Sequence, residues 1–219
     1  MTGDLVPVRV LTVQAIPNVS PELAAALGLR ADQRSVGLLS ADCDDAAYIA
    51  LDEATKAAQV EVVYAKSLYA GAPNATTALA GEVVGILAGP DPAAVTAGLR
   101  AAVGLLSGGV GFRTANDEGS VVYLAHCVSR AGTYLSRLAK VRTGEAVAYL
   151  IAPPVEALLG LDVALKAAAV ELTAFYPPPS ETNFAGGLLT GAQDACRAAC
   201  DAFAAAVRGV AAQPNQLGG

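Results

Sequence analysis

The segment LDEATKAAQVE, residues 51–61, returns 110 residues later as LDVALKAAAVE, residues 161–171. Eight of the eleven positions are identical, and the identities include an aspartate, a lysine and a glutamate as well as alanines. Each copy has the pattern of a helix that ends and runs into a strand. The offset is close to half of the 219 residues, and such self-similarity indicates one structural unit used twice. We therefore predict two tandem modules, residues 1–110 and 111–219.

Apolar runs typical of strands alternate with helical patterns on both sides of this repeat. In the first half we expect strands at 6–16, 35–41, 60–65 and 79–89, and helices at 21–29, 46–59 and 92–106. In the second half we expect strands at 120–128, 146–152, 170–176 and 183–190, and helices at 129–139, 154–169 and 192–212. Asp91 followed by Pro92 is typical of a helix start. The alternation predicts an α/β fold in both modules.

The composition is apolar, with 54% hydrophobic and 16% charged residues. No uninterrupted apolar run approaches the roughly 18 to 20 residues of a membrane span, so we expect no membrane insertion. A subunit with large contacts to its neighbours explains the composition better. The N-terminal sequence lacks the pattern of a secretory signal, which favours a cytoplasmic protein.

Charge and cysteine content narrow the function further. The net charge is −6 and no basic run is present, so a nucleic-acid partner is not expected. The four cysteines form no CxxC pair, and reduced thiols are the expectation. Cys196 and Cys200 are four residues apart on an expected helix, where small core residues are favoured over metal ligands.

Two loops follow the repeated strands at the same offset. The first, YAKSLYAGAPNATTALAGE, covers residues 64–82, and the second, YPPPSETNFAGG, covers residues 176–187. Both are rich in Gly, Pro, Ser, Thr and Asn, which is typical of irregular structure. The first is long for a simple connection between strands, which favours a functional loop.

An acidic cluster, SADCDDA at residues 40–46, holds Asp42, Asp44 and Asp45 around Cys43. A metal site is disfavoured, because the calcium-loop pattern is absent and His126 is the only histidine. Catalysis is disfavoured because no nucleophile or phosphate-binding motif accompanies the carboxylates. A receptor for a small cation fits best, since an ammonium group seeks oxygen acceptors. Asp44 as a helix N-cap, with Asp45 in the first turn and Asp42 in a turn, is a structural alternative compatible with that role.

Several long blocks of the sequence are similar to a known family. They are SVGLLSADCDD (35–45), DEATKAAQVEVVYAKSLYAGA (52–72), AHCVSRAGTYLS (125–136) and PPPSETNFAGGLLTGAQDACRAACDAF (177–203). Together they resemble the tandem-domain shell proteins of the ethanolamine-utilisation bacterial microcompartment. The resemblance implies two circularly permuted BMC-type modules, each an antiparallel-rich sheet flanked by helices. It also implies a homotrimer shaped as a pseudohexamer that tiles with other shell proteins in the microcompartment wall.

The same resemblance implies two kinds of pore and no catalytic residue, cofactor or metal. A small pore in each chain is lined by acids and holds ethanolamine; the matching residues are Asp44, Asp45 and Glu82, with the backbone carbonyl of Phe112 and the hydroxyl of Thr182. A wide central pore is gated by the two loops. The matching gate residues are Tyr69, Pro73, Asn74, Ser180 and Asn183.

Two other classes of function stay open on the residues alone. A soluble module that binds or senses small amines would use the same acidic cluster without assembling into a shell. A lyase or isomerase would use the carboxylates as acid and base.

Overall fold

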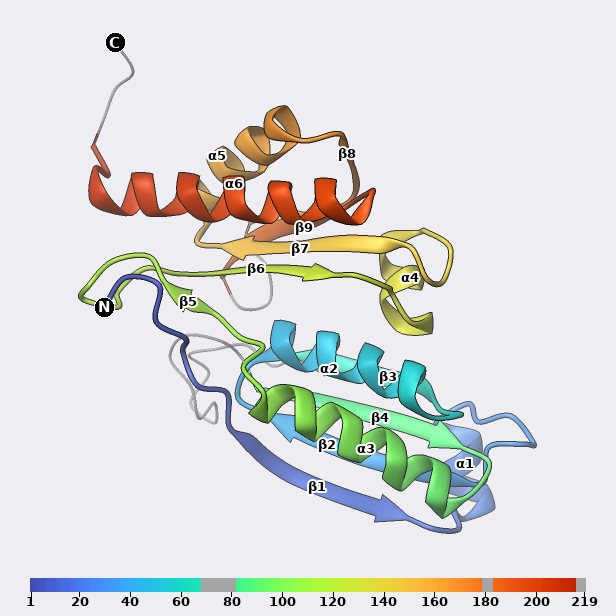
Figure 1. The fold of residues 1–219 in the computed structure, drawn as a ribbon. Helices are drawn as coiled ribbons and strands as arrows, with labels where there is room; N and C mark the ends of the chain where they lie inside the picture. The colour runs from blue at the N-terminus through green and yellow to red at the C-terminus, as the bar shows by residue number, and fades with distance from the viewer. Residues whose placement is uncertain (68–81, 179–182, 216–219) are drawn as a thin grey trace. The chain divides into compact units, whose positions relative to one another are not determined.

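The computed structural model describes residues 1–67, 82–178 and 183–215, and its contacts divide the chain into two compact units. The first unit comprises Val8–Val110 together with the short segment Gly132–Leu135. The second unit comprises Met1–Pro7, Gly111–Ala131 and Ser136–Gly219. Each unit contains its own antiparallel sheet (Figure 1).

The first unit follows the predicted alternation of strands and helices. Its elements are β1 (Val10–Ile16), α1 (Pro21–Ala26), β2 (Ser35–Ala41), α2 (Asp44–Ala57), β3 (Glu61–Ser67), β4 (Val83–Gly89) and α3 (Pro92–Ser107). The strands form a sheet of order β1-β2-β4-β3, and every neighbouring pair is antiparallel.

The second unit has the same sequence of elements, preceded by one short strand. Its elements are β5 (Arg113–Thr114), β6 (Val122–Val128), α4 (Thr133–Ala139), β7 (Ala146–Ala152), α5 (Pro154–Ala167), β8 (Val170–Tyr176), β9 (Ala185–Gly191) and α6 (Gln193–Ala212). The strand order is β5-β6-β7-β9-β8, again antiparallel throughout. Helix α4 begins within the segment Gly132–Leu135, which belongs to the first unit.

The structure confirms that one fold is used twice. Without β5, the two sheets have the same strand order, and helices α2 and α5 are both 14 residues long. The register of β3 against β4 shifts between Val62 and Tyr64, and that of β8 against β9 shifts between Leu172 and Ala174. These two irregularities stand 110 residues apart, at the offset of the sequence repeat.

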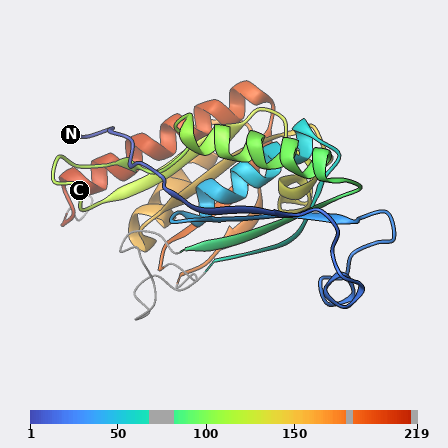
Figure 2. The same cartoon turned by 90° about the horizontal axis from the view of Figure 1, so that it is seen from below.

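Helices α2 and α3 pack side by side on one face of the first sheet, as Figure 2 shows. Two glycines of the sheet allow this close approach. A Cβ atom at Gly85 would lie 2.5 Å from Cδ1 of Leu51, and one at Gly37 would lie 2.8 Å from Cγ1 of Val95. Leu51 and Val95 are fully buried in this core.

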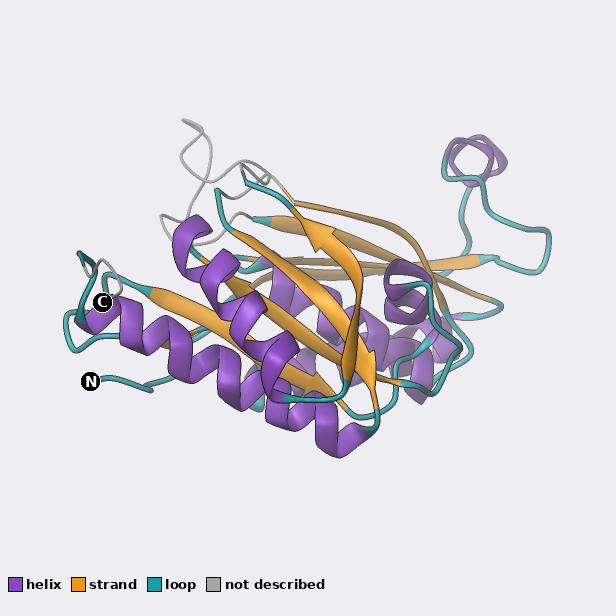
Figure 3. Ribbon diagram, turned by 90° about the horizontal axis from the view of Figure 1, so that it is seen from above, coloured by secondary structure: helices purple, strands orange, loops and turns teal. Residues whose placement is uncertain are grey.

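Helices α5 and α6 pack together in the second unit (Figure 3). Phe203 of α6 is fully buried, and Gly160 of α5 provides the space for its ring, since a Cβ there would lie 2.7 Å away. Cys196 and Cys200 are buried in the same core, which confirms the prediction that they are core residues.

Apart from the short strand β5, which was not predicted, the differences from the predictions lie at the ends of elements. The first strand begins at Val10 rather than residue 6, because the residues before it pair elsewhere through the isolated bridge between Leu5 and Arg113. The helix expected from residue 129 begins at Thr133. The helix start at Asp91 is confirmed, since its side chain accepts a hydrogen bond from the Ala94 amide at 2.8 Å. In the described part of the chain, no helix has the length and apolarity to cross a membrane.

Candidate functional site

Strand register brings the acidic segments to one end of the first sheet. Ala41, the last residue of β2, pairs with Val83, the first residue of β4. Val83 also pairs with Ser67, the last residue of β3. The acidic cluster follows Ala41 and Glu82 precedes Val83. Both therefore lie at the same end of the sheet, where β2 ends and β4 begins.

Asp44 and Asp45 open helix α2 and are almost fully buried, with exposed fractions of 4% and 7%. The prediction that Asp44 is the N-cap is wrong. Cys43 occupies that position without a side-chain capping bond, and the helix begins two residues earlier than expected. Asp44 Oδ1 accepts a hydrogen bond from the Asp45 amide at 2.9 Å. The N-terminal end of a helix stabilises such carboxylates through the positive end of its dipole.

Asp42 has a different role from its two neighbours. Its carboxylate accepts hydrogen bonds from the Arg9 amide at 2.7 Å and from Arg9 Nε at 2.8 Å. The Asp42 amide in turn donates to the Arg9 carbonyl at 3.1 Å. Asp42 therefore fastens the end of β2 to the chain that leads into β1.

A thiol and a tyrosine lie near the two buried aspartates, and a second tyrosine packs against the first. Burial, and secondly the nearby Asp45 carboxylate, raise the pKa of Cys43, so the thiol stays protonated and is a poor metal ligand. Burial also raises the pKa of Tyr48, which is hydrogen-bonded to Ser67 and feels the charge of Asp44. The rings of Tyr48 and Tyr134 lie 6.1 Å apart between centroids.

These tyrosines were not anticipated from the sequence. Tyr48 follows Asp44 by four residues, about one helical turn, and this spacing in the sequence indicates that both lie on one helix face. Tyr134 belongs to a segment far along the chain, and no local pattern indicates its approach. Carboxylates beside aromatic rings form a site suited to a small organic cation, since both attract positive charge.

Glu82 stands directly before β4, not in the middle of a strand as expected. It is half-buried, at the end of the sheet that carries Asp44 and Asp45. The other predicted ligand with a described position, Phe112, belongs to the second unit. Its ring contacts Phe184 at 5.2 Å between centroids, and its carbonyl accepts the Val6 amide at 2.8 Å. One lone pair of that carbonyl is thus already used.

Most of the predicted gate residues belong to segments outside the described part of the chain. Tyr69, Pro73, Asn74 and Ser180, together with the predicted ligand Thr182, lie outside the described residues. Asn183 is described, with a positive φ of 63°, a conformation that asparagine adopts more readily than most residues.

No group of three or more His, Cys, Asp or Glu side chains suited to a metal ion occurs within residues 1–67, 82–178 and 183–215. The acidic pair that opens α2 has no counterpart at the start of α5, where Pro154 and Val155 stand and Glu156 is the acidic residue of the first turn. At the matching end of the second sheet, β7 is followed by Pro153 and Pro154. Phe184 precedes β9, whereas Glu82 holds the equivalent position before β4.

Asp52, which the sequence showed only as part of the repeat, proves to be a structural anchor. Its carboxylate is fully buried and accepts hydrogen bonds from the amides of Gly132 at 2.7 Å and Leu135 at 2.8 Å. Gly132 allows this approach, since a Cβ there would lie 2.3 Å from Thr55 Oγ1. Burial raises the pKa of Asp52, although both amide hydrogen bonds favour the ionised form.

Comparisons with known proteins agree with this architecture. The BMC domain model matches residues 35–113. The shell protein EutL of Clostridium perfringens is 61% identical over 98% of this chain and 99% of its own length.

Solved structures give the same result. EutL from Leptotrichia buccalis superposes with a TM-score of 0.94 at 60% identity, covering 99% of this chain and all of its own. The fold extends to a trimeric shell protein, PduB, with a TM-score of 0.75 at 22% identity, over 93% of this chain and 89% of that one. The chain belongs to the EutL family of bacterial microcompartment shell proteins.

Proposed function

We propose that this chain is a wall subunit of an ethanolamine-utilisation microcompartment, which assembles as a pseudohexameric homotrimer and binds ethanolamine at Asp44, Asp45 and Glu82. The main support for ethanolamine as the ligand is the pair of buried carboxylates at the start of α2, which lie at the same end of the sheet as Glu82. Ethanolamine carries an ammonium group with three hydrogen-bond donors, and these carboxylates supply the acceptors.

Burial decides how strong this binding is. Charged hydrogen bonds contribute about 1.5–3 kcal/mol each, but part of that gain offsets the removal of the ammonium group from water. A site of this type therefore binds weakly and releases its ligand readily, as a pore requires. Contributions of the Phe112 carbonyl and the Thr182 hydroxyl stay predictions, as does a central gate formed by Tyr69, Pro73, Asn74, Ser180 and Asn183.

The trimer is supported by a difference between equivalent helices. Val155, Leu158 and Leu159 of α5 are 68%, 47% and 46% exposed. The residues 110 positions earlier on α2 are Asp45, Tyr48 and Ile49, of which Asp45 and Ile49 are buried. An exposed apolar face of this kind on one module, matched by a covered face on the other, indicates a missing partner.

The segment that covers α2 supports a choice of partner for α5. Within the first unit, Gly132–Leu135 lies on α2 through the bonds to Asp52 and the contact between Tyr134 and Tyr48. That segment begins α4, which is separated from the end of β6 by four residues, just as α1 is separated from the end of β1 by four residues. Helix α1 has no buried residue and stands apart from the sheet (Figure 3). In the proposed trimer, α1 of a second copy covers α5.

The ligand is tested by calorimetric titration of ethanolamine into the wild-type protein and the double variant Asp44→Asn with Glu82→Gln. We expect the double variant to bind at least tenfold more weakly, while its oligomeric mass stays unchanged. The matched control is Asp32→Asn, which removes an exposed carboxylate of the same unit and should have no effect. Equal affinities of wild type and double variant would remove these residues from the site.

Shell assembly is tested by co-expression with other shell proteins of an ethanolamine-utilisation microcompartment. A wall subunit purifies with the assembled particles, whereas a soluble amine sensor stays in the supernatant. Recovery only in the supernatant would contradict the proposed function and favour the sensor.

A further inference from the structure

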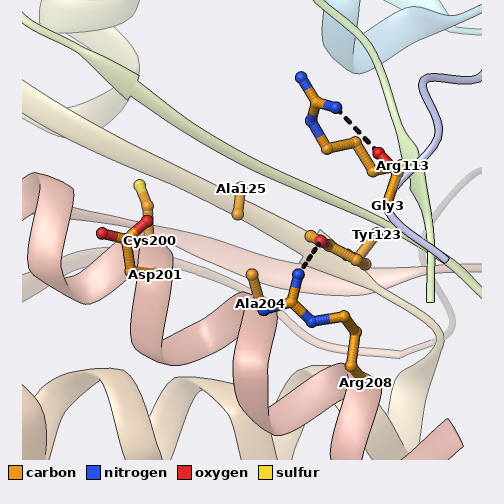
Figure 4. A pocket seen from close by; sticks show the side chains of 8 residues that line it. All are labelled: Gly3, Arg113, Tyr123, Ala125, Cys200, Asp201, Ala204 and Arg208. Carbon is orange, nitrogen blue, oxygen red and sulfur yellow. Dashed lines mark hydrogen bonds between the residues drawn. The ribbon is translucent and has the colours of Figure 1, made fainter.

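A cavity of about 420 Å³ is lined only by residues of the second unit, and none of the acidic residues of the candidate site lines it. Figure 4 shows its polar side chains: Arg113, Tyr123, Asp201 and Arg208. Its volume falls in the range of small-molecule sites. Neither the family resemblance nor the proposed function assigns it a role.

The sequence builds this cavity from two strands and one helix. Arg113 of β5 pairs directly with Tyr123 of β6, so both side chains lie on the same face of the sheet. On α6, Asp201, Ala204 and Arg208 are spaced three and four residues apart, which places them on one helix face.

Small residues keep the space between these elements open. Ala125 stands two residues after Tyr123 on β6 and therefore lies on the same face of the sheet. Together with Ala204 and Gly3 it lines the cavity without filling it. Gly3 is held in place by its amide, which donates to the Thr114 carbonyl at 2.8 Å.

Two guanidinium groups reach this cavity from different elements. Arg113 Nη1 donates to the Gly3 carbonyl at 2.9 Å, and Arg208 Nη1 donates to the Tyr123 hydroxyl at 3.3 Å. Tyr123 is only 2% exposed, and Figure 4 shows it between the two arginines. A guanidinium has five N–H donors, so each arginine keeps several for a ligand.

The nearby carboxylates do not neutralise these charges. In the described part of the chain, neither Arg113 nor Arg208 forms an ion pair. Asp4 pairs with the N-terminal ammonium group, and Asp117 accepts from both the amide and the hydroxyl of Thr2. Asp201 is the one carboxylate among the residues that line the cavity, and it repels an anionic group from the part of the cavity nearest to it.

From this arrangement we infer that the cavity is a binding site for a small phosphate-bearing molecule, held by Arg113, Arg208 and the Tyr123 hydroxyl. A phosphate group offers up to two negative charges and several acceptor oxygens, so it bridges two arginines better than a carboxylate does. Asp201 directs the phosphate toward the arginine side. Any hydroxyl or amine on the ligand then faces Asp201.

The test is a calorimetric titration of inorganic phosphate into the full-length protein at constant ionic strength. We expect saturable binding that weakens about tenfold or more in Arg113→Gln and in Arg208→Gln, since each removes a charged hydrogen-bond donor. Tyr123→Phe should weaken binding less than either. The matched control is Arg197→Gln, which removes an exposed arginine of the same helix outside the cavity.

Acetate, titrated in parallel, separates phosphate from carboxylate recognition. The thermal unfolding midpoint of each variant verifies that it folds. Arg113→Gln also removes the hydrogen bond to Gly3, and if this lowers the midpoint, the conclusion is drawn from Arg208→Gln alone. Absence of saturable phosphate binding, an equal loss in Arg197→Gln, or equal affinity for acetate would overturn the inference.

Discussion

Removal of the Asp52 carboxylate should destabilise this protein far more than removal of its repeat partner Asp162. In Asp52→Ala, the buried amides of Gly132 and Leu135 lose their acceptor. Each unsatisfied buried donor costs about 1–3 kcal/mol, so the two amides together should cost about 2–6 kcal/mol in the free energy of unfolding. For a chain of this length, that lowers the unfolding midpoint by about 4–24 °C.

Asp162→Ala provides the matched control. Asp162 occupies the same position of the repeat but is exposed, and its carboxylate accepts from Lys166 Nζ at 2.6 Å on the helix surface. Such an exposed pair contributes under about 0.5 kcal/mol. Both variants are unfolded by urea at equal chain concentration, because assembly makes stability depend on concentration. Equal losses in the two variants would refute the anchoring role of Asp52.

The raised pKa of Asp52 adds a pH dependence with a definite sign. Between the ordinary carboxyl pKa of 3.8 and the higher folded value, the folded state binds more protons than the unfolded state. The contribution of this group to stability is therefore largest at low pH and decreases as pH rises through the folded pKa. We expect the stability advantage of wild type over Asp52→Asn to shrink across that interval, as measured by urea unfolding at a series of pH values. An advantage that grows with pH would contradict this assignment.

Three further predictions concern assembly, packing and thiol reactivity. Leu158→Glu places a charge on the exposed face of α5 and should dissociate the trimer, as measured by sedimentation velocity; an unchanged mass would exclude this face from the interface. Gly186→Ala brings a Cβ to 2.0 Å from the Leu150 carbonyl oxygen and should lower the free energy of unfolding by more than about 3 kcal/mol. Gly209→Ala places a Cβ with nothing within 4 Å and should stabilise α6 by up to about 1 kcal/mol. Equal thermal unfolding midpoints for the two variants would contradict this prediction. Burial raises the pKa of Cys196 to about 11, so this thiol should react with Ellman's reagent at pH 8 only after unfolding, and fast labelling of the native protein would show that it is accessible.

The internal repeat predicted two copies of one fold, which no single helix or strand pattern could have indicated. Asp52, Lys56 and Glu61 recur in the second copy at an offset of 110 residues, and the register irregularities of the two sheets recur at the same offset. The sequence identities and the irregularities coincide because the same arrangement of helix and sheet occurs in both units. Local rules also located the helix start at Asp91 and the core role of Cys200.

The parts that local rules missed depend on residues distant in sequence. Asp52 and Asp162 occupy the same position of the repeat, each directly after a leucine, yet Asp52 is buried under Gly132 and Asp162 lies in solvent. Strand β5 has only two residues, too few for a periodic pattern, and forms because β6 offers it a partner. The approach of Tyr134 to Tyr48 is likewise a tertiary contact without a local signal.

The mass of the wild-type protein in solution, measured by light scattering during size-exclusion chromatography, tests the proposed ring of six modules most directly. We expect three times the 21.9 kDa of one chain across the accessible concentration range. A single-chain mass that persists at high concentration would mean that the exposed faces of α1 and α5 do not meet, and it would contradict the proposed wall subunit.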